Sequence, residues 1–81
     1  MKTILLTRRQ EQVSGLVSCG MAKKEIANAL HISPFTVDHI LRSVYDRTDL
    51  NKINELTGWW ISRHYDMEID FAGLKKQLLL M

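Results

Sequence analysis

The sequence has a single cysteine and no long apolar run. Cys19 cannot form a disulfide within the chain, which fits a reducing cytoplasm. No apolar segment is long enough to cross a membrane, and the stretch 4–6 between Lys2 and Arg8 is too short for a signal peptide. We therefore expect a cytoplasmic protein that makes no contact with a membrane.

Groups that could cooperate in catalysis are also missing. The three histidines, His31, His39 and His64, fall on separate expected elements, and Cys19 with His31 does not complete a zinc-binding spacing. The sequence contains no glycine-rich loop of the kind that binds phosphate. We therefore expect no enzymatic activity, no metal site, no cofactor and no small-molecule ligand.

The chain is short and mildly basic. Its 81 residues suffice for one small domain, whose limited core would gain stability from a partner subunit. The net charge is +2, and residues 1–50 hold seven Lys or Arg against five acidic residues, while residues 51–81 hold four of each. The excess positive charge therefore lies in the first part of the chain, as contact with nucleic acid would require.

Residues 23–48 have the pattern of two helices joined by a tight turn. Ser33 can cap the second helix, over 34–48, and Pro34 takes its first position, where a missing N–H costs nothing. One face of this helix carries the apolar stripe Val37, Ile40, Leu41, Val44 and Thr48. A short helix, over 23–30, then a turn and a longer helix are typical of a DNA-binding helix-turn-helix, although such pairs also occur in all-α domains of other function.

The side of the second helix away from that stripe would meet the major groove. We expect base contacts from Phe35, Asp38, His39 and Arg42. Arginine suits guanine, and aspartate can accept a hydrogen bond from cytosine. Contacts to the DNA backbone are expected from Lys23, Lys24, Ser33, Thr36 and Arg47. The alternative is a solvated surface on which Asp38 and Arg42 form an i, i+4 ion pair.

Further helices are expected on both sides of this pair. Thr7 with Gln10 has the form of a capping box, so a helix should begin after Thr7, and Gly20 should end it. Asn51 is expected to cap a fourth helix over 52–65, and Asp70 to cap a short last helix. The sequence thus predicts an all-α protein.

Two adjacent tryptophans in the expected fourth helix point to an interface. The inward stripe of that helix is Ile53, Leu56, Trp60 and His64. Trp59 must project to a different side, and a large aromatic side chain left at a surface favours contact with a partner. Alternatively, residues 67–81 cover it. The expected dimer or partner interface is Leu56, Trp59, Trp60 and Arg63.

The chain resembles the LuxR-type (GerE-type) helix-turn-helix family over roughly residues 5–56. The resemblance rests on Leu6-Thr7, Arg9, Val13, Leu16, Gly20, Lys24-Glu25-Ile26-Ala27, Leu30, Ile32-Ser33 and Thr36-Val37. The chain departs from the family pattern at Asp38, where a basic residue is usual, and at Ala22, where a capping serine is usual. The resemblance implies a four-helix domain whose third helix enters the major groove and whose fourth often forms a dimer.

These expectations combine into one hypothesis. A four-helix LuxR-type domain would span residues 1–66, and a helical extension over 67–81 would pack on that domain or on a partner. The protein would be a bacterial transcription regulator that binds double-stranded DNA as a homodimer, or as a heterodimer with another regulator. The alternative is a protein-binding module of the same fold that pairs with or blocks another LuxR-type regulator.

Overall fold

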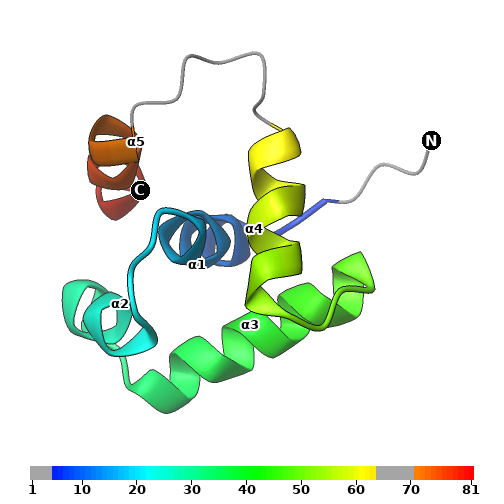
Figure 1. Cartoon of the computed structure of the whole chain (residues 1–81). Helices are drawn as coiled ribbons and strands as arrows, with labels where there is room; N and C mark the ends of the chain where they lie inside the picture. Colours follow the sequence, from blue (N-terminus) through cyan, green and yellow to red (C-terminus); the bar gives the residue numbers. More distant parts are fainter. Residues whose placement is uncertain (1–4, 64–70) are drawn as a thin grey trace.

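Five helices and no strand make up the residues that the structure, a computed structural model, describes: 5–63 and 71–81 (Figure 1). These helices are α1 (Arg8–Ser18), α2 (Lys23–Leu30), α3 (Pro34–Thr48), α4 (Ile53–Ser62) and α5 (Phe71–Leu79). The expected all-α class is therefore confirmed, and the bounds expected for the two helices of the helix-turn-helix coincide with those of α2 and α3.

The ends of α1 follow from local hydrogen bonding. Thr7 Oγ1 accepts from the Gln10 backbone N–H at 3.1 Å, and the Thr7 N–H donates to Gln10 Oε1 at 2.8 Å. These two bonds form the expected capping box, which satisfies N–H groups that have no partner inside the helix. Beyond Ser18 the chain turns at Gly20, whose φ of 93° is accessible to glycine at little cost.

The turn between α2 and α3 is fixed at both of its ends. His31 adopts a left-handed conformation with φ of 59°, and the Ile32 N–H donates back to the Ala27 carbonyl at 3.0 Å. This pattern closes a helix C-terminus. Ser33 Oγ then accepts from the Thr36 N–H at 3.1 Å, and Pro34 opens α3. The turn residues therefore set how α3 leaves α2.

The core is built around α1, which packs against each of the other four helices and lies between them in Figure 1. Its fully buried side chains include Val13 and Leu16. The other helices contribute the buried side chains Ile26, Ala27, Val37, Leu41, Val44, Leu56, Trp60 and Leu78. Burial of these apolar side chains stabilises the fold and leaves one side of α3 outside the core.

The start of α4 differs from the expectation. Lys52 occupies the position before the helix and no side chain caps it, so the expected cap at Asn51 is wrong. The Asn51 N–H instead donates to Glu55 Oε1 at 3.3 Å. Ile53 is 43% exposed and does not belong to the inward stripe, whereas Leu56 and Trp60 are buried as expected. His64, the expected end of this helix at 65, and the expected cap at Asp70 lie outside the described residues.

The last helix, α5, lies against α1. Leu78 is 5% exposed and contacts the helix at Gly15, where an added Cβ would meet Leu78 Cδ1 at 2.7 Å and Trp60 Cζ2 at 2.9 Å. Gln12 Nε2 donates to the Leu78 carbonyl at 2.9 Å. The absence of a side chain at Gly15 thus lets α1, α4 and α5 meet at one point.

Candidate nucleic-acid interface

The outward side of α3 is an exposed helix surface of the described chain. Val37, Leu41, Val44 and Thr48 turn inward, toward the other helices, and α3 runs along one edge of the molecule in Figure 1. The α2–turn–α3 arrangement therefore presents a long helix whose far side is free to enter a groove. This geometry is that of a DNA-binding helix-turn-helix.

Three of the expected base-reading residues lie in one row on that side. Phe35, His39 and Arg42 follow one another at i, i+4 and i+7, and all three are exposed. Phe35 is 79% exposed, so its ring is available for an apolar contact with a partner. Arg42 is in no ion pair of the described residues, so its guanidinium remains available for a bidentate contact.

Asp38, the fourth expected base reader, is placed differently. It lies on the flank of α3 that faces α2, and its Oδ1 is 2.7 Å from Lys23 Nζ. The ion pair between Asp38 and Arg42 that was the alternative interpretation is not among the ion pairs of the described residues. Lys23, one of the expected backbone contacts, is thus engaged by an acidic side chain of α3.

Tyr45, one of the partly buried residues at the core edge, marks the same flank. Burial raises the pKa of its phenol above the ordinary value, the nearby Lys23 ammonium lowers it, and the Asp38 carboxylate raises it. The 2.7 Å contact between the two charges places Lys23 and Asp38 together at the junction of α2 and α3, and both act on this phenol. The sequence alone does not reveal this junction, because it depends on the angle between the two helices.

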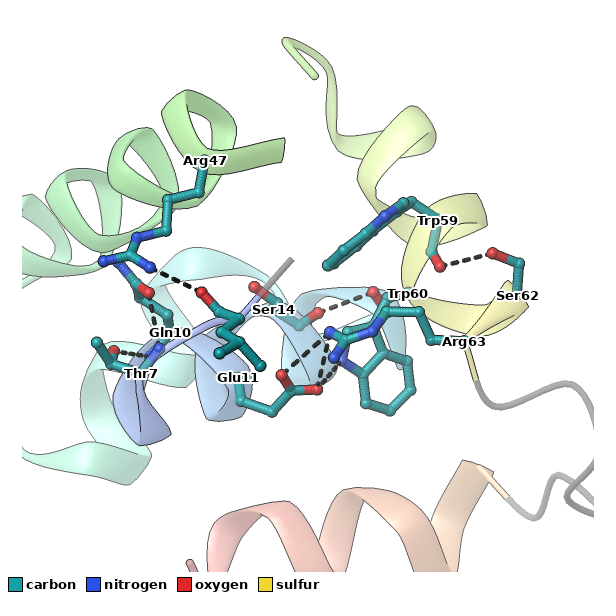
Figure 2. Close-up of polar contacts among 11 residues, drawn as sticks. Thr7, Gln10, Glu11, Ser14, Arg47, Trp59, Trp60, Ser62 and Arg63 are labelled. Carbon is teal, nitrogen blue, oxygen red and sulfur yellow. Dashed lines mark hydrogen bonds and ion pairs between the residues drawn. The ribbon is translucent and has the colours of Figure 1, made fainter. Parts of the chain in front are cut away.

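The other residues expected to contact the DNA backbone differ in whether their side chains already bond within the protein. Lys24 is exposed in the first turn of α2. Ser33 and Thr36 have their hydroxyl groups 2.9 Å apart at the start of α3, where the serine also caps the helix. Arg47 Nη1 donates to the Leu5 carbonyl at 2.8 Å and so holds the segment before α1 (Figure 2).

The expected interface on α4 is partly overturned by burial. Leu56 is 0% and Trp60 2% exposed, so these two side chains belong to the core and are not available to a partner. Trp59 is half-buried, and the Arg63 guanidinium lies 4.7 Å from the centroid of its ring. Of the four residues expected at the interface, Trp59 and Arg63 alone reach the surface.

Sequence reasoning missed Glu11, which joins α1 to α4. Its Oε1 accepts from Trp60 Nε1 at 3.1 Å, and its Oε2 is 3.2 Å from Arg63 Nη1 (Figure 2). A buried tryptophan needs an acceptor for its indole N–H, and that requirement was the available clue. The carboxylate also orients Arg63 over Trp59 and therefore shapes the surface of α4.

Other kinds of site find no support in residues 5–63 and 71–81. No group of three or more His, Cys, Asp or Glu side chains there is arranged to hold a metal ion. Within the same ranges, no helix has the length and apolar character needed to cross a membrane.

The arrangement of α2 and α3 defines the class of the protein as a helix-turn-helix domain. Residues 5–59 match the family described as bacterial regulatory proteins, luxR family. The chain belongs to this family, whose members are DNA-binding helix-turn-helix transcription regulators, and the resemblance drawn from the sequence is confirmed. Neither the comparison with curated proteins nor that with solved structures found a match. Trp60, Arg63 and α5 lie beyond the matched residues.

Proposed function

We propose that the protein regulates transcription by binding double-stranded DNA as a dimer, with α3 of each subunit in the major groove. The observation that carries this proposal is the exposed row Phe35, His39 and Arg42 on a helix whose opposite face is buried. The family assignment supports the DNA-binding role, and the row supplies three chemically different contacts on one side of the helix.

Each residue of the row has a role that its chemistry suits. Arg42 would donate two hydrogen bonds to the O6 and N7 acceptors of a guanine. Phe35 would pack against the 5-methyl group of a thymine, and His39 would hydrogen-bond a base edge between them. Lys24 and the first N–H groups of α2 would bind phosphates, which orient the domain without reading sequence.

The dimer would form through the surface of α4. Trp59 with Arg63 stacked over it, and the exposed Ile53, offer apolar area on that helix. A small domain gains stability from such a contact, and two subunits would bind two half-sites about one helical turn apart. A homodimer is the simplest form, and a heterodimer with another regulator would use the same surface.

A pair of variants tests the role of α3. DNA sites are first selected from a random duplex library with the wild-type protein, and the selected site is then compared with random duplex. We expect Arg42→Ala to weaken binding to the selected site by about 1–3 kcal/mol per subunit, roughly 5- to 150-fold for each, and to relax its preference at one guanine of each half-site.

Lys76→Ala provides the matched control, because Lys76 is an exposed cation on α5, away from α3 (Figure 1). This variant should keep the preference for the selected site. If Arg42→Ala and Lys76→Ala bind the selected site equally well, α3 does not read DNA. If the wild-type protein enriches no site from the library, the protein-binding module becomes the leading interpretation.

A further inference from the structure

The ion pair between Lys23 and Asp38 has a consequence for how the protein chooses its site. Lys23 is the first residue of α2, where a helix-turn-helix approaches a phosphate, and Asp38 belongs to the recognition helix. Their charged atoms are 2.7 Å apart, and the two side chains remain 45% and 50% exposed. The pair is therefore within reach of DNA.

The ion pair should lower the affinity of the protein for a duplex of arbitrary sequence. Non-specific binding comes almost entirely from cations that replace counterions on phosphates. Lys23 already has a carboxylate partner, so a phosphate that approaches it meets an ammonium group whose charge Asp38 offsets, and the carboxylate itself repels the polyanion. The phosphate contact that Lys23 could supply is thus offset within the protein itself.

We infer that the Lys23–Asp38 ion pair acts as a specificity determinant by suppressing binding to DNA of unrelated sequence. This inference rests on the proposed function. At the cognate site, a cytosine amino group opposite Asp38 donates to the carboxylate and takes the place of Lys23, which then binds a phosphate. At other sites no such donor meets Asp38, and the pair persists.

Among the ion pairs of the described residues, the one that involves α3 is that of Asp38. Arg42 on the outward side is in no ion pair of residues 5–63 and 71–81, and neither is the exposed Asp46. Asp46 therefore repels phosphates through its charge alone. Asp38 does the same and also weakens the contact that Lys23 could make with a phosphate. Neutralising Asp46 gives a matched control, because it removes an equal charge from the same helix.

The experiment measures the affinity for a random-sequence duplex over a range of salt concentrations. It compares wild type, Asp38→Asn, Lys23→Met and the double variant, each shown to be folded by circular dichroism. The same set is made with Asp46→Asn in place of Asp38→Asn. Methionine keeps the aliphatic stem of Lys23 and removes its charge.

We expect Asp38→Asn to raise the affinity for random duplex about two- to fivefold per subunit at low salt. It should also steepen the slope of log affinity against log salt by about 0.9 per subunit, since one more phosphate contact forms. In the Lys23→Met background, Asp38→Asn should neither raise the affinity nor steepen the salt dependence in this way. Asp46→Asn should have the same small effect whether or not Lys23 is present.

Two results would overturn the inference in distinguishable ways. If Asp38→Asn acts equally in both backgrounds, or no more strongly than Asp46→Asn, Asp38 acts only through its charge and the ion pair is no specificity determinant. If no folded variant binds random duplex even at low salt, the proposed function fails as well.

Discussion

Gly15 lies where α1 meets side chains of both α4 and α5. A methyl group there would lie 2.7 Å from Leu78 Cδ1 and 2.9 Å from Trp60 Cζ2. Leu78 has a flexible end that can shift, whereas the Trp60 ring is 2% exposed and packed in the core. We expect Gly15→Ala to lower the free energy of unfolding by about 1–3 kcal/mol, measured by urea denaturation.

Gly58 is the natural control for that substitution. It lies in the exposed part of α4, and an added Cβ would meet nothing within 4 Å. Gly58→Ala should leave stability unchanged or raise it by up to about 1 kcal/mol, because alanine favours the helix. Equal stability of the two variants would contradict the close packing at Gly15.

Cys19 gives a prediction that depends on pH. Burial raises the pKa of its thiol above the ordinary value, and Lys75 offsets part of that rise. Since the thiolate is the reactive form, iodoacetamide should modify Cys19 more slowly in the folded chain than in urea at about pH 8. The buried Cys19 thiol contributes fully to stability at pH values below the pKa that it has in the unfolded chain. This contribution is lost as the pH rises through the higher pKa that the thiol has in the folded chain.

Mass spectrometry follows the modification directly, because Cys19 is the only cysteine in the chain. The rates of the folded and unfolded chain should converge as the pH rises through the pKa of the folded thiol. Modification that is as fast in the folded chain as in urea would show that burial does not protect this thiol.

At the level of helices, the two ends of α1 and the start of α3 could be predicted because short-range chemistry sets them. Thr7, Gly20, Ser33 and Pro34 act on their own neighbours, and each does so in the structure. The start of α4 could not be predicted in this way. Asn51 is a favoured capping residue, but Glu55 binds its backbone N–H and the helix starts without a side-chain cap.

The contacts of α5 lead to a prediction about the end of the chain. Leu78 is buried against α1, whereas Leu80, two residues on, is 78% exposed. Leu78→Ala should lower the free energy of unfolding by about 2–5 kcal/mol, as for other buried leucines, when measured by urea denaturation. Leu80→Ala should change it by less than about 0.5 kcal/mol.

The difference between these two variants tests whether α5 is part of the folded unit. A small and equal effect of both would contradict the packing of α5 on α1. In that case α5 would contribute little to the stability of the folded unit.

For the whole molecule, the directions of side chains on α3 could be predicted, but their partners could not. Helical periodicity places Phe35, His39 and Arg42 on one side, as the structure has them. The Lys23–Asp38 pair depends on how α2 crosses α3, and the burial of Trp60 depends on how α4 meets α1. Both are tertiary features, which no local pattern in the sequence specifies.

The positions of the cationic side chains support DNA binding more than the net charge of the molecule does. The net charge is only +2, and one lysine of α2 is paired with an acid of α3. Arg42 and Lys24 nevertheless remain exposed beside the free side of α3. A dimer would double these contacts, so the affinity should depend steeply on salt even though each subunit offers few cations.

The most direct test of DNA binding is a fluorescence-anisotropy titration of random-sequence duplex with the full chain at two salt concentrations. With about four phosphate contacts per dimer, affinity should fall on the order of a hundredfold between about 50 and 200 mM salt. Absence of binding by the folded protein at the lower salt concentration would contradict the account. So would binding whose strength does not change with salt.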